Sequence, residues 1–431
     1  MKFVVIGITD NPQPWFPPEV MEIIKNGKVF SGGKRHHEIV APLLPHDAEW
    51  IDITVPLDNV FAQYKLKTNS PLGRRTLATN GTQEQPTATI IVFASGDPLF
   101  FGFANTLRNR FPESAIRVFP SFNSLQMLAH RLMMPYQDMR IVSLTGRPWP
   151  EFDRALIEGA GKIGILTDKE HTPAAIAQRM LEYGYKDRYT MYIGEHLGNP
   201  QLERVSRRLL EEVANSDFAQ PNCVILEPFG SWPSHRALGI PDTEFALLDG
   251  REKMITKMPI RLLTLQALEL HRRRELWDIG ACTGSVSIEA RLHFPNLRVF
   301  AFEVRPECEA IIKENARRFG APGIKVHIGD FLSVCCDDIA IYGTPDAVFI
   351  GGHGGRLKEI MTKVAGYLPP NGVIVMNSVT SPVVEQMTNR PSSRQLWDEA
   401  CHELGLHQEP PLRIQLNNHN PIEILKAKVK W

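Results

Sequence analysis

A tight turn of small residues beside one carboxylate points most directly to ligand chemistry. In the stretch ELWDIGACTGSVSIEA, the pattern D-x-G-x-C-x-G is formed by Asp278, Gly280, Cys282 and Gly284. The glycines let the backbone pass close to a ligand, and we expect a helix to begin at Ser285 with its free N–H groups facing that ligand. A dinucleotide-binding turn requires G-x-G-x-x-G, which is not present here. The turn therefore predicts a nucleotide-like cofactor other than NAD.

Two carboxylates follow the turn at the ends of the next expected strands. Glu303 ends one strand, where a carboxylate can accept both ribose hydroxyls, and Asp330 in HIGDF can accept from an adenine amino group. Each acid alone is more simply a turn or strand-end residue, so the ordered set carries the interpretation. The set resembles the D-x-G-x-G-x-G turn of class I methyltransferases, which use S-adenosylmethionine. Cys282 replaces the middle glycine, and we expect it to be tolerated because this cofactor places no pyrophosphate there.

Four glycines around a histidine follow a further apolar strand, in DAVFIGGHGGRLKEI. This stretch predicts a permissive floor beneath a large planar ligand. Arg356 and Lys358 are candidates to meet carboxylates there. His353 has two interpretations: a catalytic group, or a turn residue with local hydrogen bonds.

A second glycine-containing turn lies near the N-terminus, in VFASGDPLFFG. Pro98 fixes the turn, keeps Asp97 extended before it, and is followed by an apolar run that returns to Gly102. The Gly-Asp-Pro tripeptide is common in turns. By itself it does not specify a function.

The composition excludes several classes of protein. The chain has 431 residues, of which 22% are charged, with 48 basic against 48 acidic side chains. This balance argues against a nucleic-acid binder, and no apolar run approaches the length of a membrane span. Six scattered cysteines without a C-x-x-C pair predict neither a disulfide framework nor a metal site. We expect a reduced, cytoplasmic protein that forms a homo-oligomer and uses no metal.

Short apolar runs alternate with helical patterns along the whole chain, which predicts an α/β fold with parallel layers. The polar stretch KTNSPLGRRTLATNGTQEQPTAT is expected to be a surface loop. Prolines and glycines interrupt the pattern after NCVILEP. The predicted organisation is a domain at 1–228, a linker at 229–250 and a second domain at 251–431.

The serial order of several motifs resembles a known family across nearly the whole chain. VFSGGKRHHE, ASGDPLFFG, PSFNSLQMLAHRLMM, ILTDKEHTPAAIAQRM, LGIPDTEFALLDG, WDIGACTGS and DAVFIGGHGG follow one another as in tetrapyrrole methylases of corrin (cobalamin) synthesis. The resemblance implies a class III tetrapyrrole methylase fold with two α/β subdomains, followed by a Rossmann-like class I domain. It also implies methylation of meso carbon 5 by the first domain, and methylation of meso carbon 15 with decarboxylation of the ring C acetate by the second. The substrate is either metal-free or cobalt-bearing.

The same resemblance implies one S-adenosylmethionine for each domain and a set of cofactor residues. The first site is expected to use Gly7, Ser95, Gly96, Asp97, Leu99, Phe100 and Ser124. The second is expected to use Thr256, Asp278, Gly280, Cys282, Gly284, Ser285, Glu303, Asp330 and Phe331. The sequence departs from the family in its first loop, GITDNPQPW, where a second glycine is usual.

Methyl transfer from a sulfonium requires little from protein side chains. The tetrapyrrole supplies the carbon nucleophile, and the protein must align it with the methyl group and exclude water. The substrate carries acetate and propionate arms, so cations and polar groups are expected around it. The candidates are Lys34, Arg35, His36 and His37 in the first domain, and Lys257, Arg261, Arg356 and Asn377 in the second. His353 or a neighbouring acid is the candidate proton donor for decarboxylation.

Two other functions remain open at this stage. An RNA methyltransferase would use the same folds, but predicts a basic stripe with interleaved aromatic residues. Alternatively, the N-terminal half is a non-catalytic scaffold for one active methyltransferase, an idea supported only by the altered first loop. A dehydrogenase fails on the glycine spacing.

Overall fold

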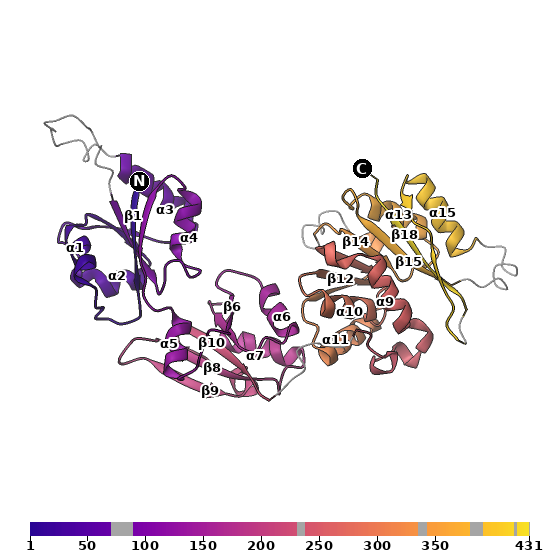
Figure 1. The fold of residues 1–431 in the computed structure, drawn as a ribbon, viewed down its shortest axis with the longest axis horizontal. Coiled ribbons are helices and arrows are strands. Elements are labelled where there is room, and N and C mark those ends of the chain that lie inside the picture. Colours follow the sequence, from indigo (N-terminus) through magenta and orange to yellow (C-terminus); the bar gives the residue numbers. More distant parts are fainter. Residues whose placement is uncertain (70–88, 231–237, 335–342, 380–390, 418–419, 431) are drawn as a thin grey trace. The chain divides into compact units, whose positions relative to one another are not determined.

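The structure is a computed structural model that describes residues 1–69, 89–230, 238–334, 343–379, 391–417 and 420–430. Figure 1 shows three sheets with flanking helices in this part of the chain. The chain divides into two compact units. Unit 1 comprises Met1–Arg147, Gly161–Gln178 and Tyr189–Phe229, and unit 2 comprises Pro148–Ala160, Arg179–Arg188 and Gly230–Trp431. In the described residues, every helix is too short or too polar to cross a membrane. Most of the predicted polar loop lies outside them.

The first sheet of unit 1 is fully parallel, with the strand order β3-β2-β4-β1-β5. Its central strands are almost continuously apolar because helices cover both faces. Val5 and Val92 face a core shared with α3 and α4, whereas Ile6 and Phe93 face a core shared with α1 and α2. The bounds are β1 Lys2–Ile8, α1 Pro18–Asn26, β2 Val29–Gly32, α2 Lys34–Val40, β3 Glu49–Asp52, α3 Leu57–Asn69, β4 Thr89–Ser95, α4 Phe103–Arg110 and β5 Ala115–Phe119.

The second sheet is mixed, with the order β6-β7-β10-β8-β9 and parallel pairing only between β6 and β7. The prediction of parallel layers throughout is therefore wrong here. The connection from β8 to β9 spans only 196–203, and a parallel neighbour requires a crossover of about a dozen residues or more. The bounds are α5 Ser124–Arg131, β6 Arg140–Ser143, α6 Pro150–Ile157, β7 Ile163–Leu166, α7 Pro173–Glu182, β8 Tyr189–Glu195, β9 Arg204–Arg208, α8 Leu210–Val213 and β10 Asn222–Pro228.

The sheet of unit 2 has the order β13-β12-β11-β14-β15-β18-β16, with β17 paired to β18. It is parallel from β13 to β15, and β18 is antiparallel. α9 and α10 pack on one face, and α13 and α15 on the other (Figure 1). The bounds are α9 Met258–Ala267, β11 Glu275–Ile279, α10 Ser285–His293, β12 Arg298–Glu303, α11 Glu307–Phe319, β13 Ile324–Ile328, β14 Ala347–Ile350, α13 Leu357–Ala365, β15 Val373–Val379, α15 Ser393–Glu403, β16 His407–Gln408, β17 Leu412–Ile414 and β18 Ile422–Lys428.

The described part of the predicted linker packs into the core of unit 2. Ile240, Phe245 and Leu248 are buried, and the first two join a cluster with Ile288 and Phe319. The exact domain boundaries stay predictions. Residues 231–237 of the predicted linker lie outside the described residues.

Candidate active sites

Unit 1 contains a cavity of about 440 Å³ at the carboxyl ends of β1 and β4. This volume lies in the usual range for small-molecule sites, roughly 300–1,000 Å³. Its wall also includes the start of α5 and residues from the ends of β6, β7 and β8. Six of the predicted residues line it: Arg35, His36, Ser95, Gly96, Phe100 and Ser124.

The Gly-Asp-Pro turn is packed backbone against backbone. Gly96 has φ +59°, and its N–H donates to the Ile8 carbonyl at 2.8 Å. A Cβ on Gly96 would lie 2.8 Å from the Asn123 Cα, and Gly7 faces the Gly96 carbonyl even more closely. Glycine is therefore required at both positions. Gly7 shapes the wall from behind without lining the cavity.

Asp97 and Leu99 lie outside the cavity lining. The Asp97 Oδ1 accepts a hydrogen bond from the Leu99 N–H at 2.9 Å, which closes a local turn. The Leu99 carbonyl accepts from Asn105 at 2.7 Å. In this geometry Asp97 shapes the turn that carries Ser95 and Gly96.

The histidine that lines the cavity is neutral near pH 7. Burial, with the Arg35 charge adding to it, lowers the pKa of His36 from 6.5 to about 4. Its Nδ1 accepts from the Gly33 N–H at 3.2 Å, so Nε2 carries the proton and donates to the Ser95 hydroxyl at 2.9 Å. Arg35 also donates to that hydroxyl, at 2.8 Å. The Ser95 O–H is thereby left to donate elsewhere.

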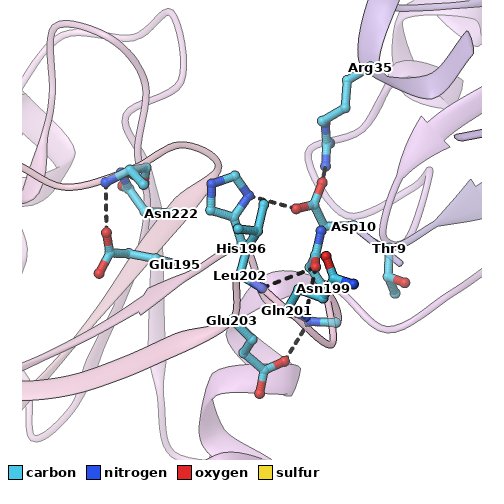
Figure 2. Close-up of polar contacts among 12 residues, drawn as sticks. Thr9, Asp10, Arg35, Glu195, His196, Asn199, Gln201, Leu202, Glu203 and Asn222 are labelled. Atoms are coloured by element: carbon cyan, nitrogen blue, oxygen red, sulfur yellow. Dashed lines mark hydrogen bonds and ion pairs between the residues drawn. The ribbon is translucent and has the colours of Figure 1, made fainter. Parts of the chain in front are cut away.

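Sequence reasoning missed Asp10, which lies in the cavity wall just beyond β1. Its carboxylate contacts the Arg35 guanidinium at 2.5 Å and His196 Nδ1 at 2.7 Å (Figure 2). A carboxylate just beyond the end of an inner strand of a parallel sheet was a usable signal. His196 carried none, because only the tertiary fold brings it to Asp10.

The predicted turn in unit 2 occupies the switch point of the sheet. β11 and β14 are neighbours whose crossovers run in opposite directions, which is where open α/β sheets bind ligands. Gly280 has φ +78°, and its N–H donates to the Phe302 carbonyl at 2.8 Å. A Cβ on Gly280 would lie 2.7 Å from the Gly352 nitrogen. The turn and the glycine-rich stretch after β14 are thus in direct backbone contact. α10 begins at Ser285, as predicted.

The cysteine in this turn adopts a conformation that usually favours glycine, with φ +50°. Its N–H donates to Glu303 Oε2 at 2.8 Å. Its side chain is buried in a cluster with Cys308 and Leu248. The thiol therefore packs into the core, which explains how a cysteine fits in the turn.

Two polar atoms in the turn are buried without a hydrogen-bond partner: Asp278 Oδ1 and Thr283 Oγ1. The other Asp278 oxygen accepts from the Ser287 N–H at 3.2 Å and the Ser287 hydroxyl at 2.6 Å. Burial raises the pKa of Asp278 to about 6, against the lowering effect of these hydrogen bonds. Buried polar groups are rarely left unpaired, so both atoms point to a ligand.

Glu303 is buried at the end of β12, as predicted, but its oxygens already have partners. Arg305 donates to Oε1 at 2.9 Å and to Oε2 at 2.9 Å, and its N–H donates to Oε1 at 3.0 Å. With the Cys282 amide, these bonds use all four lone pairs. Burial tends to raise the pKa of Glu303, but the bonds from Arg305 hold it below its usual value. A ribose can reach this carboxylate only after Arg305 moves.

Asp330 and Arg356, predicted for the adenine and for the substrate, are paired with each other. The two terminal guanidinium nitrogens of Arg356 each donate to one oxygen of the Asp330 carboxylate at 2.9 Å. The pair is partly exposed, with side-chain exposures of 33% and 47%. Its opening therefore costs little, since exposed ion pairs contribute about 1 kcal/mol or less.

His353 follows β14 and is held by local hydrogen bonds. Nδ1 accepts from the Gly355 N–H at 3.2 Å, so Nε2 carries the proton and faces the Ser393 hydroxyl at 3.2 Å. Burial lowers the pKa of His353. These contacts match the turn interpretation, and the catalytic role stays a prediction. Lys358 pairs with Glu403 at the surface.

Arg261 is fully buried and therefore does not face a substrate. Its Nε lies 2.5 Å from Glu289 Oε2, and its other nitrogens donate to Asp242 and to the Thr256 and Ile240 carbonyls. The position of Arg261 does not support the predicted substrate contact. Its ion pairs and hydrogen bonds hold the segment that precedes α9 against helix α10.

Five further predicted residues lie in different surroundings. Phe331 is buried against Trp277 and Phe302, so it supports the site from within the core. Asn377 has a buried Nδ2 without a partner, while its Oδ1 accepts from Thr264. The other three are Lys34, which is exposed, His37, which stacks on Trp50, and Lys257, which lies 3.9 Å from Asp242.

Two sequence families match the chain in turn. The tetrapyrrole (corrin/porphyrin) methylases match residues 2–214, and the precorrin methyltransferase domain matches residues 249–394. A curated relative from Sinorhizobium sp, precorrin-6Y C(5,15)-methyltransferase (decarboxylating), is 31% identical over 379 residues, which cover 88% of this chain and 84% of the relative. The chain belongs to the precorrin-6Y C(5,15)-methyltransferase family. This family consists of S-adenosylmethionine-dependent methyltransferases.

Further relatives of this precorrin-6Y methyltransferase family member match only part of the chain. The cobalt-precorrin-6B C(15)-methyltransferase (decarboxylating) of Salmonella typhimurium is 42% identical over 132 residues, or 31% of this chain and 66% of the relative. A crystal structure of a precorrin-6Y C5,15-methyltransferase from Geobacter metallireducens GS-15 shares 33% identity, with 46% of this chain and 100% of that chain covered and a TM-score of 0.38.

The turn in unit 2 fits S-adenosylmethionine. The unpaired Asp278 Oδ1 suits the ammonium group of the cofactor, and the unpaired Thr283 Oγ1 can donate to its carboxylate. No atom lies within 4 Å of a Cβ built on Gly352, Gly354 or Gly355, which leaves the backbone accessible there. In unit 1, the cavity beside Ser95 and Gly96 offers the matching space.

Proposed function

We propose that the chain is a bifunctional C-methyltransferase of corrin synthesis that binds one S-adenosylmethionine in each unit. Unit 1 methylates meso carbon 5 of precorrin-6Y, or of its cobalt form. Unit 2 methylates meso carbon 15 and removes the ring C acetate carboxyl group as carbon dioxide. The observation that carries this proposal is the presence of two separately built sites, the cavity in unit 1 and the unpaired polar atoms of the turn in unit 2.

In unit 1, the side chains bind and orient more than they react. When bound, the cofactor supplies an electrophilic methyl group, and the macrocycle supplies the attacking carbon. Phe93, Phe100 and Met127 give the cavity apolar walls that exclude water. Arg35 presents a cation to an acidic arm, and the Ser95 hydroxyl can donate beside it. Asp10, the one carboxylate in the lining of this cavity, can take up the proton that the methylated carbon system releases.

In unit 2, we propose that three acids orient the cofactor around the turn once Arg305 and Arg356 have released two of them. Asp278 faces the ammonium end, Glu303 the ribose and Asp330 the adenine, in the order of β11, β12 and β13. The glycine-rich stretch 351–355 leaves open space for a flat ligand at the carboxyl end of β14. Asn377, near the carboxyl end of β15, has an unpaired side-chain N–H group at the same end of the sheet. We propose these groups as the substrate floor.

Trideuteriomethyl-labelled S-adenosylmethionine with precorrin-6Y and its cobalt form tests the assignment. Mass spectrometry of the wild-type product should show two labelled methyl groups and the loss of one carbon dioxide. Gly96→Ala should remove only the label at carbon 5, and Gly280→Ala only the label at carbon 15 and the decarboxylation. Gly405→Ala is the matched control, because Gly405 also has a positive φ, +63°, but no atom within 4 Å of the added Cβ. A single labelled methyl group in the wild-type product would contradict the proposal.

Cytoplasmic location, homo-oligomer formation and the absence of nucleic-acid binding stay predictions from the sequence. The neutral charge balance supports the last of them.

A further inference from the structure

A buried carboxylate and a histidine form a pair at the wall of the unit 1 cavity. Asp10 is 8% exposed, and its Oδ2 lies 2.7 Å from His196 Nδ1 (Figure 2). Its other oxygen contacts Arg35 at 2.5 Å. Asp10 therefore lies between a fixed cation and an imidazole. Because a carboxylate only accepts hydrogen bonds, the His196 Nδ1–H donates to Asp10.

The backbone of His196 is held in an unfavourable conformation. Its φ is +48°, in the left-handed region, which costs a residue with a side chain roughly 1–2 kcal/mol. The His196 N–H donates to the Pro221 carbonyl at 2.8 Å, and its carbonyl accepts from the Asn199 N–H at 2.9 Å. Such strain persists only where the surroundings impose it, and it gathers at functional positions. Here it directs the imidazole to Asp10.

The loop that carries His196 is fastened on both sides. Glu203 accepts from the Gly198 N–H at 2.6 Å and pairs with Arg131 at 2.5 Å. A Cβ on Gly198 would lie 3.2 Å from Thr9, so this loop packs directly on the segment that contains Asp10. The pair is thus a preorganised feature of unit 1.

We propose that His196 is a positioning residue for methylation at carbon 5: its Nδ1–H holds Asp10 in the orientation in which it accepts a proton from the methylated macrocycle. This inference rests on the proposed function of unit 1. The bond between the meso carbon and the methyl group forms as the methyl–sulfur bond breaks, and the electron pair of that bond stays on sulfur. The cationic macrocycle then loses one proton to Asp10. The His196 Nδ1–H keeps donating to Asp10 throughout this step, and Asp10 gives its proton to water once the product has left the cavity.

The other charged groups around the pair have fixed roles. Arg35 and His36 face Asp10 from α2, and His36 stays neutral because burial lowers its pKa to about 4. On the His196 side, Glu195 accepts from the Ala219 N–H at 2.7 Å, and Glu203 pairs with Arg131. Among the described residues, the side chains that pair with Asp10 are therefore those of Arg35 and His196.

Replacement of His196 in the full chain tests this inference. His196→Gly keeps a residue suited to the left-handed backbone and removes the donor to Asp10, whereas His196→Asn keeps a side-chain donor. The readouts are the dissociation constant of S-adenosylmethionine by calorimetry, kcat and KM for label transfer to carbon 5, and the pH profile of kcat. The exposed His46 gives the matched control, His46→Gly.

Both His196 variants should bind the cofactor within about twofold of wild type. His196→Gly should lose roughly 100-fold in kcat at carbon 5, and His196→Asn should lose less because it keeps a donor. Added imidazole should restore at least about tenfold in His196→Gly, because it can replace the missing donor. An unchanged kcat, or a loss of cofactor affinity and rate without imidazole rescue, would overturn the role of His196. Failure of the wild type to label carbon 5 would instead contradict the proposed function itself.

Discussion

The two proposed cofactor sites differ in how ready they are for a ligand. The site in unit 1 is an open cavity whose turn is already formed, with Gly96 packed against Asn123 and the Ser95 hydroxyl available. In unit 2, Arg305 occupies the predicted ribose acceptor Glu303, and Arg356 occupies the predicted adenine acceptor Asp330. Unit 1 is therefore preorganised. Unit 2 must exchange internal ion pairs for contacts with the cofactor.

The internal cation Arg305 has two opposite effects on the cofactor site of unit 2. Arg305 compensates the buried Glu303, which would otherwise be an unpaired charge with a high energetic cost. The same contact competes with the ribose hydroxyls. Stability of the ligand-free unit 2 and affinity for the cofactor are thus opposed at this residue. In unit 1, the ion pair in the cavity lining joins Asp10 and Arg35, neither of which is proposed to bind the cofactor.

Removal of the buried Glu303 carboxylate should have the largest effect on the difference between the two cofactor sites. Glu303→Ala is expected to weaken cofactor binding in unit 2 by about 100-fold, since it removes two charge-assisted hydrogen bonds worth about 1.5–3 kcal/mol each, partly offset by the release of Arg305. Carbon 15 methylation and decarboxylation should fall with it, while carbon 5 methylation stays. Calorimetry and product mass spectrometry measure both. Equal loss at carbon 5 would contradict independent sites.

Acidic pH should weaken the unit 2 site and spare unit 1. The pKa of Asp278 is about 6 in the ligand-free chain, so this acid is mostly charged at pH 7 and mostly protonated at pH 5. The charged form attracts the cofactor ammonium, and affinity should fall by about tenfold from pH 7 to pH 5. Calorimetry in buffers of different ionisation enthalpy should detect proton release on binding near pH 6.

Asp278→Asn supplies the control for this pH effect. The variant should bind more weakly at pH 7 and lose most of the pH dependence. A pH dependence that persists in Asp278→Asn would assign the titration to another group.

A smaller effect is expected at the unit 1 turn. Asp97→Ala removes the hydrogen bond to the Leu99 N–H, worth about 1 kcal/mol, and should weaken cofactor binding in unit 1 about fivefold. Complete loss of carbon 5 methylation would show that Asp97 contacts a ligand directly. The rate at carbon 5 and the affinity of unit 1 decide between these outcomes.

The smallest expected change is an increase in cofactor affinity. Arg305→Ala should tighten cofactor binding in unit 2 by about threefold, because Glu303 no longer has a competing partner, and should lower the thermal stability of the ligand-free chain. Arg317→Ala, at an exposed pair with Glu314, is the matched control and should change neither. Weaker binding in Arg305→Ala would mean that the guanidinium itself holds the ligand.

Local sequence patterns predicted the parts of these sites that depend on backbone. The turn from Asp278 to Ser285, the end of β12 at Glu303 and the Gly96 turn follow from glycine spacing and strand ends. The hydrogen-bond and ion-pair partners of the side chains could not be predicted from the sequence. Arg261 looks like any surface arginine in the sequence, and only its contact with the buried Glu289 shows otherwise.

The pairing of distant segments was equally hidden from the sequence. Asp10 and His196 are separated by most of unit 1, and their contact depends on a strained loop after β8. The antiparallel pairing of β8 with β10 escaped notice because buried strands look alike in either direction, and β9 is mostly exposed and polar.

Titration of S-adenosylmethionine into the full chain by calorimetry measures the number of cofactor sites directly. The expected result is two sites per chain, of which the tighter remains in Glu303→Ala and the weaker remains in Gly96→Ala. One site in the wild type, or the loss of both sites from either change, would contradict two independently built methyl-transfer sites.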